Sequence, residues 1–205
     1  MGWQGHLWLN YRFNGGRSTV HDRHNGPLRV LQSLYPEGHA ICHNVLVHPP
    51  GGVVGGDVLN IEAKLEAGAH ALITTPGATR FYRSAGEPAV QSLTAHVANN
   101  ARLEWLPLET IAHSGCIAEN RLRFLLEPGA EMIGWDMLAL GLPASSQAFE
   151  RGRFTQSIEL PGRGLERGVI EASDTRLLDS PAGWAAQRVL GTLWFAAGGD
   201  RKSVV

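Results

Sequence analysis

A turn of similar sequence recurs along this chain at intervals of roughly 30 residues, a period typical of stacked repeat units. At each occurrence an apolar segment ends in Gly or Asn followed by Ala, and a second apolar segment then begins. The turn residues are Gly68, Asn100 and Gly129, and Gly38 precedes them at a similar spacing. Gly and Asn tolerate the positive φ of a tight turn, and the small Ala beside them allows successive turns to stack. The spacing favours a β-solenoid over a closed barrel, while ordinary hairpins in a β-sandwich stay open as the alternative.

Alternation of apolar and polar residues predicts the individual strands. In the segments 6–13 and 59–66 the apolar side chains share one face, as in a half-buried strand. The predicted inward-facing residues are Leu7, Leu9, Tyr11, Phe13, Leu59, Ile61, Ala63 and Leu65. Further strands are predicted at 28–34, 40–48, 70–75, 89–98, 101–107, 121–127, 130–138 and 153–160, and one short helix within 183–195. The sequence therefore predicts an all-β, β-helical (solenoid-like) scaffold of two stacked sheets with at most one or two short helices.

Composition agrees with this class and excludes others. The 25 glycines and 11 prolines are too many for a helical bundle, and 43% hydrophobic residues exclude a disordered chain. A formal net charge of −1 argues against a basic nucleic-acid binder. The two cysteines, Cys42 and Cys116, form no metal or disulfide motif, and no run of about 18 apolar residues occurs. We therefore expect a cytoplasmic protein that contacts neither membrane nor nucleic acid.

The end of the chain has an unusual sequence. Residues 200–205 (DRKSVV) follow Gly198-Gly199 and correspond to what a common sequencing adapter encodes when translated in frame. We expect a single β domain over 1–199 that is incomplete at its C-terminus, followed by a non-native tail at 200–205. If so, Lys64 is the only lysine of the natural sequence in this chain.

One candidate functional segment is the glycine loop, residues 48–57 (HPPGGVVGGD). Its prolines and glycines exclude a strand interior and present bare backbone, whose amides could bind an anion or the backbone of a partner. The Lys-Ser/Thr that completes a phosphate-binding P-loop does not follow, and the segment after it has the period of a strand. Taken alone, this pattern favours a structural turn.

A second candidate is the Arg-Tyr loop, residues 74–84 (TTPGATRFYRS). Pro76-Gly77 predicts a sharp turn, after which Arg80, Tyr82 and Arg83 come close together. Arg and Tyr are frequent anchors of protein interfaces, although a surface loop with a salt bridge would have the same composition. Neither loop combines a nucleophile with a His base and a carboxylate, so we predict no catalytic residue and no enzyme.

The nine histidines all lie between His6 and His113, and imidazole is a suitable ligand for divalent metals such as nickel. The sequence contains no HExxH or CxxC motif, and the adjacent Cys42 and His43 would point to opposite faces of a strand. A tight metal site is therefore not predicted, whereas a weak and transient route for a metal is compatible with the pattern.

Three segments in this order resemble the urease accessory protein D family, also called UreD or UreH: the glycine loop, the Arg-Tyr loop and residues 103–111 (LEWLPLETI). The resemblance continues more weakly through 134–149 and 180–195. It implies a β-helical scaffold without catalytic activity that binds the accessory proteins UreF and UreG and docks on the urease apoprotein. It further implies nickel in transit, delivered to urease with GTP hydrolysis by UreG, and no tightly bound cofactor.

Within that resemblance, a scaffold that passes nickel on must not trap it, which favours few and oxygen-rich ligands. We expect transient nickel contacts at His48, Asp57, Thr74 and Thr75, with Asp57 as a cap of the glycine turn being the alternative. The residues expected to shape the loops or bind partners are Gly51, Gly52, Gly55, Gly56, Pro76, Gly77, Arg80, Tyr82 and Arg83.

Two other functions remain open from the sequence. A β-solenoid that binds carbohydrate would present stacked aromatic rings, for which Trp105 and Trp135 are available, but no carboxylate pair is suitably spaced for hydrolysis. A structural oligomerisation module is the other alternative.

Overall fold

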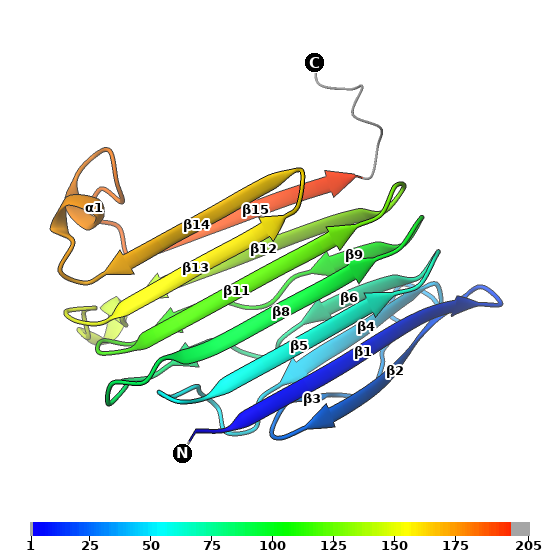
Figure 1. Cartoon of the computed structure of the whole chain (residues 1–205), viewed down its shortest axis with the longest axis horizontal. Helices are drawn as coiled ribbons and strands as arrows, with labels where there is room; N and C mark the ends of the chain where they lie inside the picture. The colour runs from blue at the N-terminus through cyan, green and yellow to red at the C-terminus, as the bar shows by residue number, and fades with distance from the viewer. Residues whose placement is uncertain (1, 198–205) are drawn as a thin grey trace.

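A computed structural model describes residues 2–197, and in it two sheets stack face to face as the layers of a flattened β-solenoid (Figure 1). The first sheet contains, in spatial order, β14 (Gly164–Glu171), β13 (Arg153–Leu160), β11 (Ile117–Leu126), β8 (Ala89–Val97), β5 (Val58–Leu65), β1 (Gln4–Asn14) and β2 (Arg17–Asn25). The second contains β3 (Arg29–Val30), β4 (Ile41–Val47), β6 (His70–Thr74), β9 (Arg102–Trp105), β12 (Glu131–Leu140), β10 (Thr110–Ala112) and β7 (Thr79–Phe81), with β15 (Val189–Ala197) paired to β12. The predicted all-β, two-sheet solenoid is confirmed.

The chain alternates between the sheets, so each coil adds strands to both. The central strands β1, β5, β8, β11 and β13 are therefore parallel neighbours. Antiparallel pairs occur at the ends of the stack, where β2 folds back on β1, β14 folds back on β13, and β15 runs against β12. Residues 2–197 contain no helix that is both long and apolar enough to cross a membrane.

The predicted stacking of the recurrent turns is confirmed. Gly68, Asn100 and Gly129 all have positive φ, at 75°, 56° and 77°. The amide of Gly68 donates to the carbonyl of Asn99 at 3.3 Å, and the side-chain amide of Asn99 donates to the carbonyl of Pro128 at 2.7 Å. Each turn is thus hydrogen-bonded to the next one along the solenoid.

The alanine after each turn residue lies inside this stack. Ala69, Ala101 and Ala130 are fully buried. The amide of Arg102 donates to the carbonyl of Ala69 at 2.8 Å, and the amide of Glu131 donates to the carbonyl of Ala101 at 3.0 Å. Three small side chains therefore form a continuous column, which explains why alanine recurs at this position.

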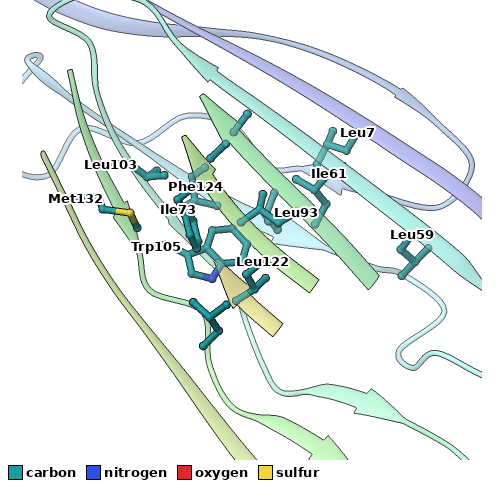
Figure 2. Packing of buried hydrophobic residues seen from close by; sticks show 14 of the residues in the cluster. Leu7, Leu59, Ile61, Ile73, Leu93, Leu103, Trp105, Leu122, Phe124 and Met132 are labelled. Atoms are coloured by element: carbon teal, nitrogen blue, oxygen red, sulfur yellow. The ribbon is translucent and has the colours of Figure 1, made fainter. Parts of the chain in front are cut away.

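Between the sheets lies a core of side chains stacked in register (Figure 2). One aliphatic row crosses five strands of the first sheet through Leu7, Ile61, Leu93, Leu122 and Ile158. All five are buried, with at most 4% of the residue surface exposed. Such ladders of like residues follow directly from parallel pairing without a shift in register.

The prediction that Phe13 faces the core is wrong. Phe13 is 44% exposed, whereas the other seven inward-facing residues predicted for the two alternating segments are buried. Strand β5 ends at Leu65, which pairs with Tyr11, so Phe13 lies beyond the end of the neighbouring strand. There it lies near the Gly68 turn instead of in the core.

The helix predicted within 183–195 is also wrong. Residues 181–186 form turns, in which Ala185 and Ala186 have positive φ, and residues 189–197 form β15. The two short helices lie elsewhere: the 3-10 helix at Pro143–Ser145, and α1 (Thr175–Asp179), whose first turn is capped by the carboxylate of Asp174. β-branched and aromatic residues after position 188 favour a strand, and β12 provides the pairing partner.

The strand predictions differ from the structure in further places, and the short strands β7 and β10 are absent from the prediction. Of the strand predicted at 28–34, only Arg29–Val30 is a strand element. The strands β2 and β14 are absent from the prediction, because edge strands with one exposed face lack a clear apolar alternation. The tail predicted at 200–205 lies outside the described residues.

Candidate functional site

The glycine loop and the Arg-Tyr loop meet at one end of the strands, opposite the stacked turns. The amide of Val53 donates to the carbonyl of Arg80 at 2.8 Å, and the amide of Tyr82 donates to the carbonyl of Val53 at 2.9 Å. These bonds join the glycine loop to β7 as a short parallel bridge opposite Phe81. Two segments that are separated in the sequence by a complete pair of strands therefore form one structural unit.

The glycines allow this close approach. A Cβ atom on Gly52 would overlap the ring of Tyr82, and one on Gly55 would overlap the hydroxyl of Ser84. Gly51 and Gly56 have φ of 78° and 90°, which residues with a side chain rarely adopt. The backbone of the glycine loop is consequently covered by side chains of the Arg-Tyr loop.

Asp57 closes the glycine loop from inside. It is 1% exposed, and its Oδ1 accepts a hydrogen bond from the amide of Trp3 at 2.7 Å while its Oδ2 accepts one from the amide of Val54 at 2.9 Å. This is the geometry of a turn cap. Both carboxylate oxygens therefore have backbone donors.

A cavity of about 300 Å³ lies between the two sheets directly beneath these loops. His48, Gly51 and Gly52 form one side of its mouth, and residues 75–80 form the other. Its walls include apolar side chains of both sheets, among them Ile61 and Trp105. The two loops thus border an opening into the interior of the solenoid.

His48 carries a free polar atom at this mouth. Its Nε2 is buried and has no hydrogen-bond partner among residues 2–197. Burial lowers the pKa of His48, and the nearby Asp57 carboxylate opposes that shift. The imidazole is therefore neutral at pH 7, which is the form that coordinates metal ions.

A row of polar side chains continues inward from the mouth. The amide of Gln91 donates to Oδ1 of Asn120 at 3.3 Å, and the amide of Asn120 donates to Oδ1 of Asp136 at 3.4 Å. All three line the cavity, and burial raises the pKa of Asp136 to about 6. Gln156, on the next strand, is also buried, and its side-chain amide opposes the effect of burial by lowering the pKa of Asp136.

Sequence reasoning missed this polar row, although a signal for it exists. The alternation of apolar and polar residues predicts apolar, inward-facing side chains at three positions that instead hold Asn120, Asp136 and Gln156. A polar residue at such a position is costly to bury, so it marks either a hydrogen-bond network or a site.

The two threonines differ in their position. Thr75 lines the cavity, and its hydroxyl donates to the carbonyl of Gly77 at 3.0 Å and accepts from the amide of Leu108 at 3.0 Å. Thr74 lies outside the lining residues, and its hydroxyl donates to the carbonyl of Leu106 at 2.7 Å. Both hydroxyl groups therefore also hold the loop to the segment that follows β9.

Comparison with known proteins decides the family. Residues 4–204 match the family model described as UreD urease accessory protein. The chain belongs to the UreD family. It is 64% identical over 200 residues to the urease accessory protein UreD of Leptothrix cholodnii, covering 97% of this chain and 72% of that protein. It is 61% and 62% identical over 198 residues to the proteins of the same name from Variovorax paradoxus and Albidiferax ferrireducens, with the same coverage. The resemblance seen in the three sequence segments is confirmed.

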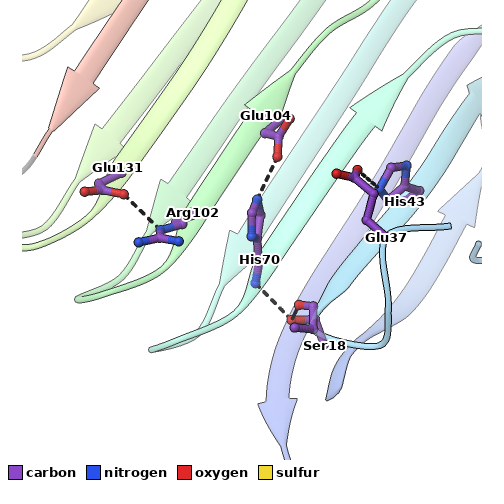
Figure 3. A network of polar contacts seen from close by, with 8 residues as sticks. Ser18, Glu37, His43, His70, Arg102, Glu104 and Glu131 are labelled. Carbon is purple, nitrogen blue, oxygen red and sulfur yellow. Dashed lines mark hydrogen bonds and ion pairs between the residues drawn. The ribbon is translucent and has the colours of Figure 1, made fainter. Parts of the chain in front are cut away.

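Outside the cavity, this UreD chain places two further histidines against glutamate carboxylates on the outer face of the second sheet (Figure 3). His43 pairs with Glu37 at 2.9 Å and His70 with Glu104 at 2.8 Å. Cys42 is buried on the opposite face from His43, as predicted. Across residues 2–197, no three His, Cys, Asp or Glu side chains are grouped so that they could hold a metal ion.

The two tryptophans considered for carbohydrate binding do not form a platform. Trp105 is 3% exposed and belongs to the core. Trp135 is half-buried, and its indole N–H donates to the carbonyl of Pro107 at 2.6 Å.

Proposed function

We propose that this chain is a non-catalytic scaffold for nickel delivery during urease maturation. In this proposal it binds the accessory proteins UreF and UreG, docks on the urease apoprotein, and allows nickel to reach the urease active site. Membership of the UreD family supports the link to urease maturation. The observation that carries the nickel role is the row of polar side chains in the cavity whose mouth is built by the two loops.

The chemistry of the cavity suits a metal ion in transit. His48 offers one neutral imidazole at the mouth, with an Nε2 that has no partner among the described residues. Thr75, Asn120 and Asp136 follow with oxygen ligands, of which only Asp136 can carry a charge. A single imidazole and scattered oxygen donors bind Ni²⁺ weakly, because late first-row metals are held tightly by several nitrogen or sulfur ligands.

Asp57 and Thr74 have an indirect part in this proposal. Asp57 holds the glycine loop in the conformation that leaves the mouth open, and Thr74 fixes the start of the Arg-Tyr loop. Each could still contact a passing ion through an oxygen lone pair that its hydrogen bonds leave free.

For the partners, we propose that the rim of the mouth is part of the docking surface. Arg80 lines the mouth and is exposed, Arg83 is exposed three residues further along the same loop, and Tyr82 packs beside His113 with ring centroids 4.7 Å apart. Arg and Tyr in such a position can bury both area and hydrogen bonds against a partner.

The nickel role is tested by comparing two histidines. His48 lines the cavity, whereas His70 lies on the outer face of the second sheet, where it contacts Glu104. We expect His48→Gln to lower the nickel content of urease matured in cells that depend on this chain, and His70→Gln to leave it unchanged. Equal nickel content with both variants would contradict the proposal.

Partner binding is measured in the same cells. Affinity purification of the tagged chain should recover UreF, UreG and urease subunits, and the His48→Gln variant should recover them in equal amounts. Failure of the unmodified chain to recover any of them would contradict the scaffold role, whatever happens to nickel.

A further inference from the structure

A second surface feature lies on the outer face of the first sheet, on the far side from the cavity. There a groove of about 470 Å³ crosses β2, β1, β5 and β8. Three basic side chains occupy one transverse row of this groove, because His21 pairs with Asn10, Asn10 with Lys64, and Lys64 with His96. Adjacent strands are about 4.8 Å apart, so the row spans roughly 14 Å.

The neighbouring row adds an arginine and an aromatic wall. Arg23 lies opposite Trp8, with its guanidinium carbon 5.4 Å from the centre of the Trp8 ring. On the same tryptophan the ring of His6 stacks at 3.6 Å. The groove therefore offers both positive charge and a flat apolar surface.

One acidic residue, Glu62, lines the groove, and it contacts His6 at 2.7 Å. Glu66, outside the lining residues, is paired with Arg12 at 3.0 Å. Within residues 2–197, in contrast, none of His21, Arg23, Lys64 and His96 forms an ion pair. All four are exposed, so the charges of Arg23 and Lys64 and the imidazole N–H groups of the two histidines are available to a ligand.

A comparison within the same sheet shows that this arrangement is not general. A second groove, at the other end of the sheet, also contains arginines. There Arg121 is paired with Glu119 and Arg123 with Glu159, so most of the positive charge is neutralised. Of the two grooves, the one around Lys64 combines cations that have no acidic partner in the described chain with an aromatic side chain.

We propose that the groove formed by Trp8, His21, Arg23, Lys64 and His96 binds a short acidic segment of a partner protein. Carboxylates of the segment would contact the basic row, and an apolar side chain would pack on Trp8. A protein segment is favoured over nucleic acid, because Arg23 and Lys64 on a chain of net charge −1 do not provide the extended basic field that phosphate backbones require. Because the groove lies on the outer face, the partner could remain bound while the cavity is in use.

The test uses a fluorescein-labelled hexaglutamate peptide as the probe, with fluorescence anisotropy as the measurement. We expect the peptide to bind, its affinity to fall as salt is added, and the double variant Arg23→Glu, Lys64→Glu to bind it at least tenfold more weakly. Arg176→Glu is the matched control, since Arg176 is exposed on α1 far along the chain from the groove. Thermal unfolding of each variant checks that the fold is retained.

Zero-length carbodiimide crosslinking locates the contact directly. The chain has only two lysines, Lys64 and Lys202, so a peptide carboxylate bound in the groove should form an amide with Lys64. Binding that is equal in the charge-reversal and control variants, or crosslinks confined to Lys202 and the terminal amine, would overturn the proposal. So would a labelled oligonucleotide of equal charge that binds the groove more tightly than the peptide.

Discussion

Among single residues, the contact between Gly52 and Tyr82 explains why one glycine of the loop tolerates no side chain. We expect Gly52→Ala to lower the free energy of unfolding by about 1–3 kcal/mol, because the new methyl group overlaps the Tyr82 ring and forces it to move. Gly77→Ala is the control, since a Cβ there meets no described atom within 4 Å. Urea unfolding of both variants measures the difference, and equal stability would contradict the packing described for the two loops.

The Asp136 carboxylate makes a pH-dependent contribution to stability. Burial raises the pKa of Asp136 to about 6, whereas an unfolded chain gives Asp a pKa of about 3.9. Between these values the folded state holds the proton more tightly than the unfolded state does, so the stability contributed by this group is present at low pH and is lost as pH rises towards 6.

Asp136→Asn should remove this loss, because the amide cannot titrate and still offers Asn120 an acceptor oxygen. Relative to the unmodified protein, we expect the variant to gain about 2–3 kcal/mol of unfolding free energy between pH 4 and pH 7, at 1.36 kcal/mol per pKa unit. Urea unfolding at a series of pH values checks this. A difference that is constant with pH would mean that Asp136 titrates normally.

Some residues of the candidate site can be predicted from the sequence, and others cannot. The order of the motifs indicates that His48, Asp57 and the Arg-Tyr loop matter, and a turn cap is one of the two roles that the sequence allows for Asp57. Nothing in the sequence indicates that Asn120 on β11 and Asp136 on β12 lie together, because the two strands belong to different sheets and their contact depends on how the sheets pack. Packing between the sheets is a tertiary property that alternation alone does not determine.

At the scale of secondary-structure elements, the column of alanines predicts that a larger side chain is tolerated at some turn positions and not at others. Ala101→Leu should lower the free energy of unfolding by about 1–3 kcal/mol, because Ala101 is fully buried between the turns that contain Ala69 and Ala130. Ala67→Leu, in the exposed part of a neighbouring turn, should change it by no more than about 0.5 kcal/mol. Urea unfolding of the two variants is the measurement, and similar losses would contradict the stacked arrangement.

Strands are predicted well where one face is buried by the other sheet, as in β5 and β13. They are predicted poorly at the ends of the stack. In β15 the residues facing outward are themselves apolar, so no alternation of apolar and polar residues is visible. The strand forms because it pairs along its whole length with β12. Tertiary pairing of this kind overrides local propensity.

In the molecule as a whole, the two ends of the stack differ in character. The β2 edge carries His21, Asp22 and Arg23, which discourage pairing with another sheet edge. On β15, at the other end, Leu193 and Phe195 are each 69% exposed. The molecule therefore has one polar end and one apolar end.

We expect the double variant Leu193→Thr, Phe195→Thr to reduce self-association of the chain. The two threonines retain strand propensity while shrinking the apolar surface, so the free energy of unfolding should change little. Static light scattering over a range of protein concentrations measures the effect. Leu108→Thr, which alters a less exposed leucine on a loop, is the control, and an equal effect of both changes would contradict a specific apolar end.

The stacked turns and the loops around the cavity lie at opposite ends of the strands. Three turns at one end are hydrogen-bonded to one another, so an inserted residue in any of them would disturb the coils on both sides. At the other end the connections are longer and differ from coil to coil, as in residues 48–57 and 141–152. Changes in loop length can therefore accumulate at the mouth of the cavity without altering the rise of the solenoid. The turns at one end of the strands are therefore fixed in length, whereas the loops at the other end can vary in length.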